Sequence, residues 1–257
     1  MENNLLVGLS RQMALSHELD VVANNIANVD TTGFKADNAA FSEYLTSSAR
    51  DEDFGGKDKR VSFVQDRATW IDMSPGSLQR TGNPLDVAID GKGFLVVQTP
   101  QGQRYTRNGA LTTSATGQIV TLDGNQVVGA AGPITLQAGD HDINISSTGV
   151  VTVRDSTNTE SPRGQLQVVN FDQPQRLQKD AGSMFAAPAG VDPGPQPPNT
   201  RVVQGVIEKS NVHPIAQMAR MIEITRNYAD ISAILQQESD QHRTALQTLS
   251  QAPSANS

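Results

Sequence analysis

The sequence contains no cysteine, which excludes disulfide bonds and thiol chemistry. Its four histidines are scattered, and no two of them have the i, i+4 spacing of a helical metal site. Gly-x-Ser-x-Gly is absent, and the stretches Gly55–Lys57 and Gly91–Gly93 lack Walker spacing and a following helix. The only acid–His cluster, Asp140–Asp142, reads as a solvated turn. We therefore expect no enzymatic activity, no cofactor and no metal site.

Long apolar runs and excess positive charge are also missing. The chain carries 20 Lys and Arg against 27 Asp and Glu, with no basic run, so no nucleic-acid binding is expected. No stretch approaches the roughly 18 consecutive apolar residues of a membrane span, so no direct membrane insertion is expected. Residues Met1–Leu5 lack the basic start of a cleaved signal peptide.

A helical pattern near the N-terminus is the clearest positive signal. Apolar residues recur at intervals of four and three, as in a helix that packs along another helix. The helix is predicted over residues 3–29, ending at Gly33 in a left-handed conformation. Asn24, Asn25 and Asn28 are costly in a helix unless their amides find partners. We call the apolar line along which this helix is expected to pack the seam. Its residues are Leu15, Leu19, Val22, Ile26 and Val29.

A second helical seam closes the chain. Residues 210–250 are predicted as a helix with Pro214 in its first turn, and the neutral His213 is a poor N-cap, so Asn211 is an alternative start. The two helices are expected to pair, which brings both ends of the chain into one module. The seam residues of the second helix are Met221, Ile224, Tyr228, Ile231 and Leu235.

Between the helices the pattern changes to short strands and tight turns. Residues 34–80 hold six of the eleven aromatic residues around a polar loop at Asp51–Arg60. They are interpreted either as an extended arm packed on a neighbouring domain or subunit, or as rings that cap the β domain. Residues 105–113 are predicted as one continuous strand, and Arg201–Glu208 as a return strand that pairs with the arm.

The predicted fold class is α+β, with long terminal helices pairing as a coiled coil around an inserted antiparallel all-β domain. The expected segments are an axial helix (1–33), an extended arm (34–80), an antiparallel β domain (81–187), a Pro-rich strut with return strand (188–209), a C-terminal axial helix (210–250) and a disordered tail (251–257).

The stretch Ala23-Asn-Asn-Ile-Ala-Asn-Val-Asp-Thr-Thr-Gly-Phe-Lys35 closely resembles the signature of the axial proteins of the bacterial flagellum. Residues 81–94 and 105–109 look like the core motifs of rod and hook proteins, and residues 210–228 resemble the C-terminal signature. The resemblance covers essentially the whole chain in family order. One departure is His213, where the family usually has an acidic residue.

The resemblance implies a structural subunit of the basal-body rod, in the periplasm, that transmits torque for motility. Length favours a rod protein over a hook protein, and residues 1–13 and 235–240 look most like the proximal-rod type, with the distal-rod type as the alternative. The implied partners are other rod subunits, in a homo- and hetero-oligomeric axial assembly, and the flagellar export apparatus. Export would proceed unfolded, without a cleavable signal peptide.

Two other classes are considered. A periplasmic cell-wall-binding or wall-cleaving protein would need a buried acid or metal site, and a stand-alone coiled-coil module would not need the inserted β domain. The favoured mechanism is mechanical, with the asparagines setting the register between subunits. The predicted subunit-interface residues are Leu19, Val22, Asn24, Asn25, Ile26, Asn28, Val29, Met221, Ile224, Tyr228, Ile231 and Leu235.

Overall fold

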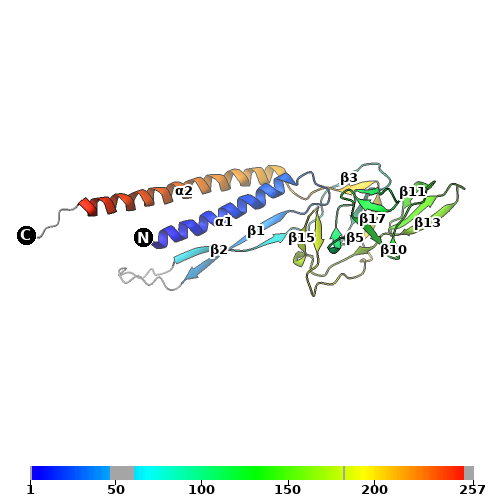
Figure 1. The fold of residues 1–257 in the computed structure, drawn as a ribbon, viewed down its shortest axis with the longest axis horizontal. Helices are drawn as coiled ribbons and strands as arrows, with labels where there is room; N and C mark the ends of the chain where they lie inside the picture. The colour runs from blue at the N-terminus through cyan, green and yellow to red at the C-terminus, as the bar shows by residue number, and fades with distance from the viewer. Residues whose placement is uncertain (1, 47–60, 182, 252–257) are drawn as a thin grey trace, which may run out of the picture. The chain divides into compact units, whose positions relative to one another are not determined.

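The computed structural model describes residues 2–46, 61–181 and 183–251 (Figure 1). The chain divides into two compact units, named here the helical unit and the β unit. The helical unit contains residues 1–26, 37–70 and 214–257, and the β unit contains residues 27–36 and 71–213. The loop predicted at Asp51–Arg60 and all but the first residue of the predicted tail lie outside the described residues.

Two long helices run side by side in opposite directions in the helical unit (Figure 1). They are α1 (Glu2–Ala27) and α2 (Pro214–Gln251). Arg220 of α2 forms an ion pair with Glu18 of α1 at 2.5 Å, and Gln12 donates a hydrogen bond to Ser232 at 3.3 Å. The strands β1 (Asp37–Thr46) and β2 (Val61–Ile71) form a two-stranded sheet. Neither α1 nor α2 is apolar enough along its described length to cross a membrane.

The start of α2 follows from its sequence. Pro214 lacks a backbone N–H and has a fixed φ, both compatible with the first helical position. The alternative start at Asn211 is wrong, because that side chain serves another purpose. Its Oδ1 accepts the backbone N–H of Ala36 at 2.8 Å, and its Nδ2 donates to the carbonyl oxygen of Asp72 at 2.8 Å.

The β unit is antiparallel at each described strand pair. Its largest sheet has the order β15-β16-β6-β5-β9-β8-β7, with β10 paired to β9 and β14 to β5. These strands are β5 (Phe94–Thr99), β6 (Gly102–Thr106), β7 (Leu111–Thr113), β8 (Ile119–Thr121), β9 (Gln126–Gly129), β10 (Gly132–Pro133), β14 (Val168–Val169), β15 (Gln178–Asp180) and β16 (Met184–Ala186). A short 3-10 helix, η1 (Pro174–Arg176), precedes β15.

Smaller sheets complete this unit. A three-stranded sheet has the order β11-β12-β13, and β17 pairs with β4 while β18 pairs with β3. The strands are β3 (Leu78–Arg80), β4 (Val87–Asp90), β11 (His141–Ile145), β12 (Val150–Arg154), β13 (Glu160–Gln165), β17 (Arg201–Gln204) and β18 (Val206–Glu208).

Strand β5 lies between two hydrophobic clusters. Leu95 and Val97 belong to a mainly aliphatic cluster, whereas Phe94 and Val96 belong to a cluster rich in aromatic rings. Because successive side chains of a strand point to opposite faces, both faces of β5 are buried. This accounts for the unbroken apolar run of β5, although its sheet is antiparallel.

Two strand predictions need correction. The single strand expected over residues 105–113 is interrupted between β6 and β7. Gly109, in the interruption, lies against the backbone of Val87, so no side chain would fit at this position. The expected return strand is two strands separated by Gly205, whose φ of 70° turns the chain. Only β18 pairs within the predicted arm, through β3, whereas β17 pairs with β4.

Candidate assembly interface

The signature segment that follows α1 enters a buried ion cluster in the β unit. Lys35 Nζ lies 2.5 Å from Glu208 Oε1 and donates to the carbonyl oxygen of Ser74 at 2.7 Å. Arg107 Nη1 lies 3.4 Å from Glu208 Oε2. The side chains of Lys35 and Glu208 are each 1% exposed, so these charges depend on one another and not on water.

Backbone groups complete this cluster. Arg107 donates to the carbonyl oxygens of Ile89 at 3.1 Å and Gly91 at 2.8 Å, and Gly76 N–H donates to Glu208 Oε1 at 2.9 Å. Burial lowers the pKa of Lys35 and also that of Arg107, and the Glu208 carboxylate opposes both shifts. The arrangement is closed and hydrogen-bonded, as expected of a structural ion cluster.

Gly33 brings the signature segment close to the β unit's own backbone. Its φ is +69°, and a Cβ atom there would lie 2.4 Å from the backbone nitrogen of Asn108. Its N–H donates to the carbonyl oxygen of Glu208 at 2.8 Å. Two motifs that are separate in the sequence, 23–35 and 105–109, therefore meet Glu208, which ends the predicted strand before the C-terminal motif.

The sequence reading missed this cluster. Lys35 and Arg107 lie within the motifs at residues 23–35 and 105–109, and Glu208 is the last residue of a predicted strand. The sequence alone indicated no role for any of the three. The available signal was a charged residue within an apolar strand pattern, since buried charges are almost always paired. Sequence spacing could not supply the pairing, because Lys35 and Glu208 are 173 residues apart.

The predicted interface residues of the first helix are distributed over several environments. Val22 and Asn25 are buried, Leu19 and Ile26 are half-buried, and Asn24 is exposed. The remaining two, Asn28 and Val29, follow α1 in the β unit and are half-buried.

Asn25 has a role inside the chain. Its Nδ2 donates to the carbonyl oxygen of Asp37 at 2.7 Å, and its Oδ1 accepts the N–H of the same residue at 2.9 Å. The side chain is 1% exposed, so both amide groups hold the start of β1 against α1. This amide is used within the subunit, contrary to the predicted bond to an adjacent subunit.

Most of the seam residues predicted for the second helix are half-buried in the structure. Ile224 is 1% exposed, whereas Met221, Ile231 and Leu235 are half-buried and Tyr228 is exposed. Leu235 lies against Gly8 of α1, where an added Cβ would approach Leu235 Cδ2 to 2.6 Å. The two helices thus approach closely at Gly8, and a side chain added there would require Leu235 to shift.

Each helix also carries an exposed apolar stripe that the seams do not include. At roughly 100° per residue, the stripe lies about 150° around the helix from the predicted seam in α1 and about 130° from it in α2. We call them the α1 stripe and the α2 stripe. The α1 stripe consists of Leu6, Leu9 and Met13, and the α2 stripe of Ile215, Met218 and Ile222. These six side chains are between 44% and 84% exposed, which is unusual for residues of this size.

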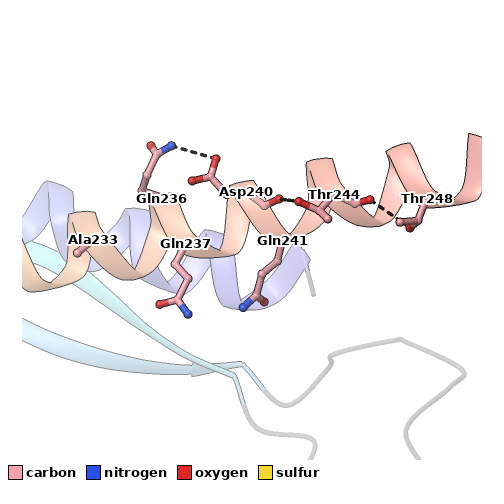
Figure 2. Close-up of a pocket in the computed structure, with 7 residues that line it drawn as sticks. All are labelled: Ala233, Gln236, Gln237, Asp240, Gln241, Thr244 and Thr248. Carbon is pink, nitrogen blue, oxygen red and sulfur yellow. Dashed lines mark hydrogen bonds between the residues drawn. The ribbon is translucent and has the colours of Figure 1, made fainter.

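The C-terminal half of α2 has a polar face instead. Figure 2 shows Gln236 bonded to Asp240, with the hydroxyls of Thr244 and Thr248 bonded to carbonyl oxygens one turn earlier. Together with Gln237 and Gln241 they line an open hollow of about 760 Å³. Across the described residues, no group of three His, Asp or Glu side chains could hold a metal ion.

Three family models match separate parts of the chain. The model of the flagella basal body rod protein matches residues 5–35, and that of the flagellar hook protein FlgE/F/G D1 domain matches residues 88–153. The model of the flagellar basal body rod FlgEFG protein C-terminal matches residues 203–248.

Full-length relatives decide the assignment. The chain is 33% identical over 250 residues to the flagellar basal-body rod protein FlgF of Caulobacter vibrioides, covering 97% of this chain and 98% of the relative. The chain belongs to the flagellar basal-body rod family. It is also 31% identical to FlgF of Escherichia coli K12, over 97% and 99% of the two chains. FlgG of Bacillus subtilis is 30% identical over 91% and 94%.

These comparisons agree with the type predicted from the sequence. The FlgF relatives of Caulobacter vibrioides and Escherichia coli each cover 97% of the chain, against 91% for the FlgG relative, and the proximal-rod type is the FlgF type. This member of the rod family is a structural subunit of the proximal rod of the bacterial flagellum.

Proposed function

We propose that this rod subunit polymerises through its two terminal helices and so transmits torque along the rod through the periplasm. The observation that carries the proposal is the pair of exposed apolar stripes on α1 and α2. A folded monomer gains nothing from exposing six large apolar side chains, whereas an assembly buries them.

The two stripes favour head-to-tail packing. Glu18 lies beside Arg220 and Gly8 beside Leu235, so the α1 stripe and the α2 stripe lie toward opposite ends of the antiparallel helix pair. Packing the α1 stripe of one subunit on the α2 stripe of the next uses two different surfaces. Such a head-to-tail interface yields an open filament when its rotation does not close a ring, as a rod requires.

The seams predicted from the sequence also have a role in this proposal, both within the subunit and between subunits. Val22 and Ile224 are buried within the subunit, so they hold the helices in the form that presents the stripes. The half-buried seam residues Leu19, Ile26, Met221, Ile231 and Leu235, and the exposed Tyr228 and Asn24, are proposed to complete coiled-coil contacts with adjacent subunits.

The proposed partners are other rod subunits, both identical and related, and the flagellar export apparatus. Export of an unfolded chain without a cleavable signal peptide is part of the proposal. The role is mechanical, not enzymatic, since the relatives are named as rod proteins and the buried Lys35, Arg107 and Glu208 pair with one another.

The proposal is tested by locating the protein in purified basal bodies with a labelled antibody. We expect label on the rod at its end nearest the cell body. Label at the end nearest the hook would indicate the distal-rod alternative. Absence from the rod, combined with binding to purified cell wall, would overturn the assignment in favour of a wall-binding protein.

A further inference from the structure

Methionine is the only sulfur-containing residue type of this chain, which has six methionines and no cysteine. Two methionines lie in the exposed stripes, Met13 in the α1 stripe and Met218 in the α2 stripe. They are 66% and 52% exposed. One of the three large apolar residues of each stripe is therefore a thioether that solvent reaches in the single subunit.

The other described methionines are better covered. Met184 is 8% exposed and lies in the aliphatic cluster of the β unit, where its sulfur accepts a hydrogen bond from Asn125 Nδ2 at 3.8 Å. Met73 and Met221 are half-buried. Because an oxidant must reach the sulfur atom, the two stripe methionines are the most accessible to oxidants among the described methionines.

Oxidation changes a stripe methionine from an apolar to a polar side chain. With hydrogen peroxide, the sulfur lone pair attacks one peroxide oxygen, the O–O bond breaks, and the second oxygen leaves as water. The sulfur loses two electrons and the peroxide gains them. The product, methionine sulfoxide, carries a hydrogen-bond acceptor that the thioether lacks.

The stripes offer this acceptor no donor. They consist of Leu, Ile and Met side chains, so a sulfoxide packed against the stripe of the next subunit is buried without a hydrogen bond. One buried, unsatisfied acceptor weakens an interface by about tenfold. In the single subunit the same oxygen is hydrated by solvent, so oxidation leaves the fold intact.

We propose that Met13 and Met218 are oxidation sites through which peroxides block the addition of this subunit to the rod. The inference rests on the proposed assembly through the stripes. Oxidation acts before assembly, because the assembled interface covers both sulfur atoms. Enzymatic reduction of the sulfoxides restores the thioethers, so the block is reversible.

The first test maps the reaction in the purified full-length chain. Hydrogen peroxide is added to the dilute protein, and peptide mass spectrometry follows the oxygen gained by each methionine. We expect Met13 and Met218 to react about tenfold faster than Met184, because access to the sulfur controls the rate. Oxidation of Met184 as fast as that of the two stripe methionines would overturn the proposal.

The second test measures assembly in cells with two double variants. Met13→Gln with Met218→Gln imitates both sulfoxides, whereas Met13→Leu with Met218→Leu removes both sulfur atoms and keeps the apolar volume. Relative to the exported amount, the double glutamine variant should reach about a tenth of the normal level in purified basal bodies, or less. The double leucine variant should assemble normally.

Peroxide added during rod assembly should lower the incorporation of the unchanged protein but not that of the double leucine variant. An equal loss for these two proteins would overturn the proposal, because the damage would then lie outside the two methionines. Normal assembly of the double glutamine variant would also overturn it.

Ile222→Asp separates this proposal from the proposed function. Its carboxylate disrupts the α2 stripe whatever the state of the methionines. Exclusion of Ile222→Asp from basal bodies, together with normal assembly of the double glutamine variant, would reject the oxidation sites and leave assembly through the stripes standing. Normal assembly of both variants would reject the two proposals together.

Discussion

At the residue scale, a few buried charges and glycines hold the β unit together. Lys35 is the last residue of the signature motif, and Glu208 lies at the end of β18, so one ion pair joins the beginning and the end of the β unit's chain. Buried ion pairs contribute little net stability, but removing one partner leaves the other charge unpaired.

Glu208→Gln should therefore be strongly destabilising. It leaves Lys35 and Arg107 in a closed site with no carboxylate, and we expect a loss of about 3–5 kcal/mol in the free energy of unfolding. Denaturant unfolding followed by circular dichroism measures it. Glu160→Gln, an exposed position in the same unit, should change stability by less than about 0.5 kcal/mol. Equal stabilities of the two variants would contradict the assigned role of the ion cluster.

Gly33 and Gly82 offer a matched pair of substitutions. Both have positive φ, +69° and +76°, but only Gly33 has backbone atoms within contact distance of an added Cβ. Gly82→Ala should cost about 1 kcal/mol for its conformation alone, and Gly33→Ala clearly more, because the backbone of Asn108 must also move. Comparing the unfolding free energies of the two variants checks this, and a smaller cost at Gly33 would show that the close approach is unimportant.

Residue-scale prediction from the sequence succeeded where the cause is local. The left-handed conformation of Gly33 was predicted from its place after a helix and is confirmed. The role of Asn25 was not, because its partner Asp37 lies beyond the turn, and a helical pattern does not show which amide meets which strand.

At the element scale, the ion pair between Asp140 and Arg163 stabilises the three-stranded sheet β11-β12-β13. Asp140 was interpreted as part of a solvated turn, but both of its oxygens accept from Arg163, at 2.5 and 2.7 Å, and one also accepts the N–H of Gln137. The bond to Arg163 holds the pKa of Asp140 below its usual 3.8.

The sign of the pH effect follows from that shift. The stabilisation from Asp140 is present above pH 3.8 and is lost as the pH falls through the lowered pKa of the folded state. Asp140→Asn imitates the protonated form at neutral pH, so hydrogen exchange in β11 and β13 should accelerate. Asp142→Asn is the control, because its ion pair with Arg154 is long, at 3.7 Å, and exposed. Equal exchange rates in the two variants would refute the role of Asp140.

Element prediction was reliable for periodic segments and weak at their ends. Both helices were predicted from their 3–4 spacing, and the first ends at Ala27, two residues earlier than predicted. The strand expected across residues 105–113 failed because local alternation does not reveal the approach of Gly109 to Val87. That approach is a tertiary contact, set by a strand more than a dozen residues earlier.

At the scale of the whole molecule, the two ends of the chain share one unit, as the matching seams predicted. The coiled-coil geometry of their pairing stays a prediction. The structure adds that the stripes of α1 and α2 remain exposed in the single subunit. Which apolar face is used inside a subunit and which outside depends on the partner helix, and the sequence does not reveal its rotation.

The central claim is that the exposed stripes, not only the seams, join one subunit to the next. Ile222→Asp tests it, because Ile222 is 55% exposed and its substitution leaves the interior of the subunit intact. In an assembled rod the new carboxylate would be buried without a partner, at a cost of several kcal/mol per subunit. Gln237→Asp places the same charge on the polar face of α2 and serves as the control.

The measurement is the amount of each variant in purified basal bodies relative to the amount exported from the cell. For Ile222→Asp we predict export and circular dichroism like those of the unchanged protein, loss of swimming, and at most a few per cent of the normal amount in basal bodies. Gln237→Asp should assemble normally. Recovery of Ile222→Asp from basal bodies at the normal level would contradict assembly through the exposed stripes.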